Sequence, residues 1–173
     1  MMDYKKALGE TDGDLEKAVD FLRQKGLAVA QKRAGRSTSE GVVQTYIHAG
    51  GKLGVMVEVN CETDFVAKTD DFQNFAREIA MHIAAMNPIA LNEDGVEQDV
   101  IEKEIEIAKD QLRQEGKPEE MLDKIAQGKL KRFFKDNTLV NQDFIKDSKV
   151  SVGKYVKSIG DVEITDFKRV ALG

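Results

Sequence analysis

The sequence predicts an α+β fold, in which a three-stranded antiparallel sheet packs against helices and a helical hairpin protrudes. Two stretches of alternating apolar residues flank Gly50-Gly51, which is typical of a β-hairpin. The apolar spacing then changes from two residues to about 3.6 across residues 63–66, so a helix follows the second strand. Farther on, Gly116-Lys117-Pro118 separates an acidic apolar stripe from a basic one, which indicates two helices joined by a short loop.

Composition limits the class of protein. The 173 residues suffice for one hydrophobic core with a small satellite domain. The net charge of −5 argues against a protein that coats nucleic acid, although a local basic patch is compatible with it. No apolar run approaches the roughly 18 residues of a membrane span, and the start shows no signal-peptide pattern, so neither a membrane nor secretion is expected. The only cysteine, Cys61, excludes an internal disulfide and is expected to be an inert core thiol.

The first 40 residues precede the predicted core. Residues 1–26 predict two short helices around the turn Asp12-Gly13-Asp14, with Asp14 as the second helix's N-cap and Gly26 as its stop. Two helices of this length bury too little to be stable alone, so an earlier helix is expected. Residues 27–40 have weak periodicity and predict a basic linker, which is either a solvated tether or a partner contact.

The core domain is expected to span residues 41–173 and to begin with the hairpin. Residues 41–48 form its first strand, and residues 53–60 form its second. The second strand has one buried face, because its valines recur at every other position: Val55, Val57 and Val59. The following helix carries apolar residues at helical spacing up to Met86, and Pro88 ends it.

Residues 63–66 lie at the corner between that strand and that helix, and two interpretations fit them. In the first, Thr63 or Asp64 satisfies free backbone N–H groups and Phe65 packs into the core. In the second, the corner holds a side chain outward on rigid supports, where binding residues tend to occur. The residues alone leave both open.

The helical hairpin is expected at about residues 97–135. Residues 93–120 hold eleven acidic and four basic residues, whereas residues 124–135 hold five basic and no acidic residues. These basic residues either pair with the other arm or form an RNA-facing patch, and the apolar residues between them favour pairing. His48 and His82, with one cysteine, make no credible zinc site, and His82 is expected to be a partly buried helix residue.

The C-terminal segment begins with an irregular stretch, residues 137–152, that carries a few apolar anchors. Ser151 caps a short helix, and Gly160-Asp161 turns the chain into a last strand. The alternation of this strand slips between Ile164 and Phe167, which predicts a bulge. A hairpin alone is marginal in water, so this strand is expected to complete the sheet as its third member.

Several ordered motifs resemble the elongation factor Ts family, the guanine-nucleotide exchange factors of elongation factor Tu. They are MMDYKKAL, NCETDFVAK with FQNFAREIAMHIAAMNP, EGKPEEMLDKIAQGKLKRFF, NQDFIKD and VEITDFKRVALG. The resemblance implies that residues 1–26 are part of a ubiquitin-associated-type helical module and that the core is the short, single-repeat form. It also implies a cytoplasmic bacterial or an organellar protein with no cofactor, and a possible homodimer. Some short members reinforce that dimer with a cysteine in the last strand, where Lys168 stands here, so a dimer would be noncovalent there.

The resemblance also assigns contacts with elongation factor Tu to particular residues. Asp64 and Phe65 match the pair that reaches the nucleotide-binding domain, where the ring wedges between helices near the magnesium ion, and Thr63 and Val66 flank that pair. Further matching positions are Met1, Met2 and Lys5 for the same domain, and His48 and Ile145 for the third domain. Lys146 follows Ile145 where some members have an apolar residue, which weakens that last match.

The expected function is acceleration of GDP release from elongation factor Tu, and two alternatives stay open. One is a docking module that binds the same partner without full exchange activity. The other is an RNA-binding protein that uses residues 124–135. A P-loop and a nucleophile–base–acid set are both missing from the sequence, so an enzyme in the bond-making sense is not expected.

Overall fold

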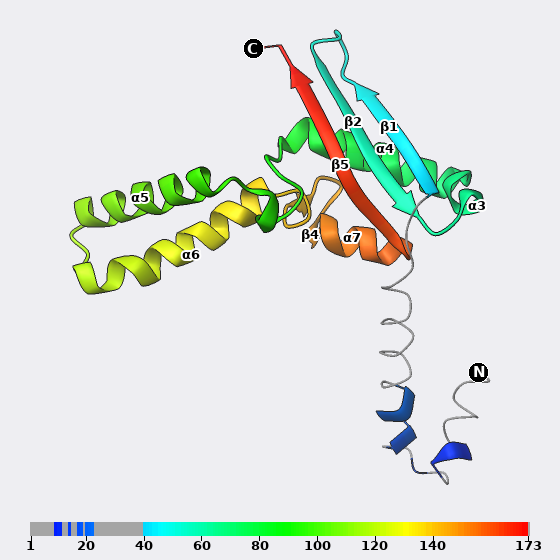
Figure 1. The fold of residues 1–173 in the computed structure, drawn as a ribbon, viewed down its shortest axis with the longest axis horizontal. Helices are drawn as coiled ribbons and strands as arrows, with labels where there is room; N and C mark the ends of the chain where they lie inside the picture. Colours follow the sequence, from blue (N-terminus) through cyan, green and yellow to red (C-terminus); the bar gives the residue numbers. More distant parts are fainter. Residues whose placement is uncertain (1–8, 12–13, 15–16, 19, 23–39, 173) are drawn as a thin grey trace. The chain divides into compact units, whose positions relative to one another are not determined.

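The computed structural model describes residues 9–11, 14, 17–18, 20–22 and 40–172 (Figure 1). The chain divides into two compact units, Met1–Ser37 and Thr38–Gly173. In the first unit, the N–H of Lys17 donates to Asp14 Oδ1 at 3.1 Å, which is the contact of a helix N-cap. Residues 27–39 of the predicted linker and the residues Met1, Met2 and Lys5 lie outside the described residues, and the ubiquitin-associated-type module is only sparsely described. Glu40, predicted as the end of the linker, is the first residue of a strand.

The second unit is built on a three-stranded antiparallel sheet. Its order is β1 (Glu40–Ile47), β2 (Leu53–Cys61) and β5 (Val162–Ala171), with β2 in the centre. Gly50 and Gly51 have φ values of 90° and 69° in the β1–β2 turn, a conformation that glycine adopts without strain. The β2–β5 register shifts between Glu58 and Val59, where Thr165 is the extra residue. The predicted third strand and the predicted bulge are therefore confirmed.

One face of the sheet packs on helices and the other is open. The α4 helix (Asp70–Met86) runs behind the sheet in Figure 1 and contacts β1 and β2. Alternation places the valines of β2 toward α4, and the buried core includes Val55, Val57, Val59, Phe72, Phe75, Ile79 and Ile83. Cys61 is buried in this core, as predicted. The outer face carries exposed apolar side chains instead: Val43, Ile47, Met56 and Val170.

The predicted helical hairpin is confirmed and protrudes from the sheet (Figure 1). Its arms are α5 (Gln98–Gln114) and α6 (Glu119–Asn137). Pro118 is the N-cap residue of α6, and Glu119 is the first helical residue. Polar contacts join the arms: Lys109–Asp123 at 2.5 Å, Arg113–Glu119 at 3.0 Å and Lys129–Gln111 at 3.1 Å. Charge pairs do cross the hairpin, but their cations, Lys109 and Arg113, lie on α5 and not among the basic residues 124–135. Lys129 of that basic stretch contacts the neutral Gln111.

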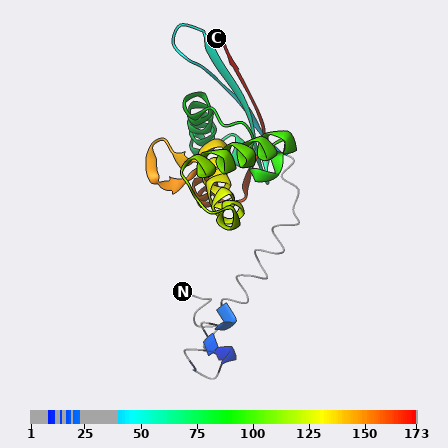
Figure 2. The same ribbon diagram turned by 90° about the vertical axis from the view of Figure 1, so that its left-hand side faces the viewer.

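The stretch predicted as irregular contains a small second sheet, so that prediction is wrong. It is formed by β3 (Asp143–Phe144) and β4 (Asp147–Ser151), which Figure 2 shows in orange beside the helices. The short helices α3 (Asp64–Ala67), η1 (Glu93–Gly95) and α7 (Val152–Ile159) complete this part of the fold. None of the helices in the described stretches has the length and apolar character needed to cross a bilayer.

Candidate functional site

The corner after β2 holds a large aromatic ring in water. The side chain of Thr63 caps α3 by accepting from the N–H of Val66 at 3.4 Å, and Ala67 anchors the helix in the core. Phe65, in the first turn, is 80% exposed, and Val66 is 40% exposed. The interpretation in which Phe65 packs into the core is therefore wrong. A phenyl ring exposed on a capped and anchored support is suited to binding a partner.

An ion pair flanks this ring. Lys68 Nζ lies 2.8 Å from Asp64 Oδ2, one helical turn away. The hydrogen bond from Lys68 lowers the pKa of Asp64, and the same contact raises the pKa of Lys68. Both groups face water, so the pair adds little to stability. At neutral pH the corner presents a carboxylate beside an apolar ring.

His48 lies at the opposite end of the β1–β2 hairpin from this corner. It directly follows β1, and its Nδ1 lies 3.0 Å from the hydroxyl of the half-buried Tyr46. Their ring centroids are 6.1 Å apart. Between the two ends runs β2, whose nine residues span roughly 26 Å at about 3.3 Å per step. The structure thus places Phe65 and His48 in two separate exposed regions.

Ile145 forms a third exposed position, in the turn between β3 and β4. Its side chain is 42% exposed, while its backbone N–H donates to His82 Nδ1 at 3.3 Å. The neighbouring Lys146 lies 2.6 Å from Glu78 on α4. Glu78 also accepts from the hydroxyl of Tyr155 at 2.6 Å.

Burial and hydrogen bonds shift the pKa values of Glu78, Tyr155 and His82. Burial raises the pKa of Glu78, but hydrogen bonds from Lys146 and Tyr155 outweigh it, and the net pKa is lowered. Burial and the Glu78 carboxylate raise the pKa of Tyr155. Burial lowers the pKa of His82, against a smaller opposing effect of its hydrogen bond with Gln142. Glu78 is thus charged and His82 neutral near pH 7.

Sequence reasoning missed the residues that support these positions. His82 was expected to be partly buried, yet it is fully buried. Its place on the apolar stripe, three residues after Ile79 and seven after Phe75, was the available signal. No local pattern marks Glu78 or Gln142, because their partners lie on other elements of the fold. None marks Tyr46 either, whose partner His48 follows two residues later.

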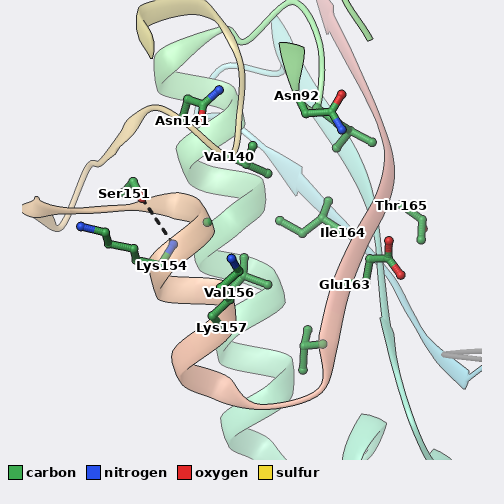
Figure 3. Close-up of a pocket in the computed structure, with 13 residues that line it drawn as sticks. Asn92, Val140, Asn141, Ser151, Lys154, Val156, Lys157, Glu163, Ile164 and Thr165 are labelled. Atoms are coloured by element: carbon green, nitrogen blue, oxygen red, sulfur yellow. Dashed lines mark hydrogen bonds between the residues drawn. The ribbon is translucent and has the colours of Figure 1, made fainter. Parts of the chain in front are cut away.

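A groove of about 560 Å³ lies between α7 and β5 (Figure 3). Its wall includes Lys154 and Lys157 from the helix and Glu163 and Thr165 from the strand, above apolar residues such as Ile164. Ser151 contributes its hydroxyl to the helix cap, where it accepts from the N–H of Lys154 at 3.4 Å. Within the described part of the chain, no three His, Cys, Asp or Glu side chains are grouped to hold a metal ion.

Known proteins resemble this chain over almost its whole length. The family model described as Elongation factor TS matches residues 25–173. The protein named Elongation factor Ts from Desulfosudis oleivorans is 56% identical, and the match covers 100% of this chain and 90% of that protein. The one from Syntrophomonas wolfei is 58% identical over 90% of this chain and 73% of its own length. Geobacter metallireducens has one that is 52% identical over 100% of this chain and 82% of its own length. The chain therefore belongs to the elongation factor Ts family.

Proposed function

We propose that this chain binds elongation factor Tu and accelerates the release of GDP from it during translation elongation. Membership in the elongation factor Ts family supports the general role, a nucleotide exchange factor of protein biosynthesis. The relatives with known names are bacterial proteins, and we place the chain in a bacterial cytoplasm. The exposed ring of Phe65 is the single observation that carries the finer mechanism.

In this mechanism Phe65 acts as a wedge. The ring enters between helices of the partner's nucleotide-binding domain near the magnesium ion, with the Asp64 carboxylate beside it. The wedge displaces groups that hold the magnesium ion and the phosphates, so GDP leaves without any covalent step. The cap from Thr63 and the buried Ala67 support this role, because a wedge is effective only if its own base does not yield.

Linkage explains how a binding protein can speed release. If the factor and GDP disfavour each other on the partner, the free energy of that coupling is reciprocal. The factor therefore weakens GDP binding by the same amount by which GDP weakens binding of the factor. Tight docking elsewhere on the partner offsets the cost of inserting the ring.

That docking is assigned to the other exposed positions. His48 and Ile145 contact the partner's third domain in this proposal, and Met1, Met2 and Lys5 contact its nucleotide-binding domain. The separation of roughly 26 Å along β2 between the corner and His48 supports contacts with two different domains. One region then holds the partner while the other distorts its nucleotide site.

Stopped-flow release of a fluorescent GDP analogue from elongation factor Tu tests the wedge. Phe65→Ala is expected to slow the factor-stimulated release by about tenfold or more, as for a central aromatic contact. The fold should survive, because an 80% exposed ring contributes little to the core. Met121→Ala is the matched control, since Met121 is an apolar side chain 50% exposed on the helical hairpin.

Different outcomes separate the alternatives. Equal release rates for the wild type and Phe65→Ala would remove the wedge. Binding without acceleration by the wild-type chain would make it a docking module. For the RNA-binding alternative, affinity for RNA must fall steeply with salt. Three of the basic residues of α6 already have polar partners, which does not favour it: Lys129, Arg132 and Lys135.

We also propose that two copies of the chain pair noncovalently through the outer face of the sheet. Val43, Ile47, Met56 and Val170 are between 52% and 70% exposed there. Register places them on one face, because Met56 is opposite Thr45 and Lys168, and Gly54 is opposite Ile47 and Val170. A hollow of about 330 Å³ lies among Ile47, Met56 and Val170. A clustered apolar face of this kind is typical of protein interfaces.

A further inference from the structure

The turn that carries Ile145 is fastened to α4 at two points. His82 Nδ1 accepts from the backbone N–H of Ile145 at 3.3 Å, and Glu78 Oε1 lies 2.6 Å from Lys146 Nζ. Glu78 and His82 are four residues apart, so they lie on one face of the helix. The two contacts hold two consecutive residues of the turn.

Packed aromatic rings support the same turn, since Phe144 directly precedes Ile145. Phe144 is buried, and its ring centroid lies 4.4 Å from that of Tyr155 and 5.9 Å from that of His82. The hydroxyl of Tyr155 donates to Glu78 at 2.6 Å. Ile145 is therefore held through its own backbone and both neighbours, while its side chain is 42% exposed.

The hydrogen bonds define the state of the buried imidazole. Because Nδ1 accepts from a backbone N–H, the proton of the neutral ring lies on Nε2. Nε2 is 3.0 Å from Gln142 Oε1, which accepts it. The amide nitrogen of Gln142 then donates to Asp136 O at 2.9 Å and to Met86 O at 3.3 Å. Every donor in this series of hydrogen bonds has an acceptor, so the orientation of the His82 ring is fixed.

We propose that His82 is a positioning residue that presents Ile145 to the partner, with Glu78 as its second fastening. This inference rests on the proposed function, in which Ile145 docks on elongation factor Tu. A turn that is already ordered loses less conformational freedom on binding than a free one. His82 therefore acts on docking, whereas Phe65 acts on GDP release.

Two isosteric variants separate positioning from simple core stability. The amide oxygen of His82→Asn falls near Nδ1, so it keeps an acceptor for the Ile145 N–H and loses the contact with Gln142. The amide of His82→Gln falls near Nε2, so it keeps Gln142 and loses that acceptor. Each variant loses one buried hydrogen bond and leaves the former partner unpaired: Gln142 Oε1 in His82→Asn and the Ile145 N–H in His82→Gln.

The measurement is dissociation of each variant from nucleotide-free elongation factor Tu, together with amide hydrogen exchange of Ile145 in the free chain. His82→Gln should dissociate at least about fivefold faster and exchange the Ile145 amide faster, whereas His82→Asn stays within about twofold of the wild type. In the exchange assay, His82→Gln should raise the half-saturating concentration of factor and leave the maximal rate of GDP release unchanged. Equal effects of the two variants would overturn the inference.

A double-mutant cycle with Ile145→Ala separates the docking contact of Ile145 from the positioning role of His82. If Ile145→Ala alone leaves dissociation unchanged, the docking contact of the proposed function fails and the inference fails with it. Suppose that Ile145→Ala weakens binding, and that His82→Gln weakens binding of the Ile145→Ala chain as much as it weakens binding of the wild type. Only the positioning role is then overturned. We expect no further loss. Should His82→Gln unfold the chain, Glu78→Gln on the half-buried face of α4 tests the second fastening in the same cycle. It should speed dissociation, and Ile145→Ala should then add no further loss, while the Ile145 amide keeps its His82 acceptor. An unchanged dissociation rate would overturn the inference.

Discussion

Phe65 and His82 both have surroundings opposite to those of most residues of their kind. Phe65 is apolar and 80% exposed, whereas His82 is polar and fully buried. Local sequence left both interpretations of Phe65 open, because the spacing of a corner residue matches neither a strand nor a helix. The exposure of Phe65 depends on Thr63 and Ala67, which orient α3, and on the end of β2. That dependence is visible only in three dimensions.

The buried imidazole predicts a specific dependence of stability on pH. Burial lowers the pKa of His82 below its ordinary value of 6.5, so the unfolded chain binds a proton there more readily than the folded chain does. Its contribution is fully present above about pH 6.5 and decreases as the pH falls below that value. The pKa of Glu78 is also lowered, from 4.5, so its effect belongs to more acidic conditions.

Chemical denaturation at pH 7.5 and pH 5.5 checks this dependence. The free energy of unfolding should fall more for the wild type than for His82→Gln, because glutamine does not titrate. Groups common to both chains cancel in this comparison. An equal fall in both chains would mean that protonation of His82 does not oppose folding.

At the scale of elements, periodicity predicted what is long and regular. The α4 helix, the two arms of the hairpin and the three long strands follow from apolar spacing, and the slip in alternation located the bulge at Thr165. The β3–β4 sheet was missed because β3 has two residues, too few for any alternation. Its stability comes from distant contacts, such as Phe144 on Tyr155 and Ile145 on His82.

The helical hairpin allows a test of element stability without touching the proposed site. Gly128 lies exposed within α6, and a Cβ added there meets no atom within 4 Å. Gly128→Ala should therefore raise the free energy of unfolding by about 0.5–1 kcal/mol, since alanine loses less backbone entropy in a helix. Thermal or denaturant unfolding measures it, and nucleotide exchange should stay at the wild-type rate. A destabilised Gly128→Ala chain would mean that α6 needs this glycine for a reason that its surroundings do not reveal.

In the unit Thr38–Gly173, the core sheet has one uncovered face, and the proposed docking side chains are exposed at three separate positions. The open face gives a testable prediction about assembly. In the wild type, light scattering after size exclusion should give the mass of a dimer, and Met56→Asp should shift it to the monomer by placing a charge in the apolar centre. Met121→Asp serves as control on the hairpin. A monomeric wild-type chain at micromolar concentration would contradict the pairing.

The candidate site could be predicted in part. The resemblance named Thr63, Asp64, Phe65, Val66, His48 and Ile145, and the structure places all of them on the surface or at its edge. Their supports could not be named, because Tyr46, Glu78, His82 and Gln142 act through folded contacts. The roles of Met1, Met2 and Lys5 stay predictions, since these residues lie outside the described ones.

The coupling between factor and GDP on elongation factor Tu tests the central mechanism most directly. Titration calorimetry would give the affinity of the wild type and of Phe65→Ala for the nucleotide-free and the GDP-bound partner. We expect the wild type to bind the nucleotide-free form at least about tenfold more tightly, and Phe65→Ala to bind both forms almost equally. A ratio of affinities that Phe65→Ala leaves unchanged would contradict the mechanism, because the ring would then contribute nothing to the competition with GDP.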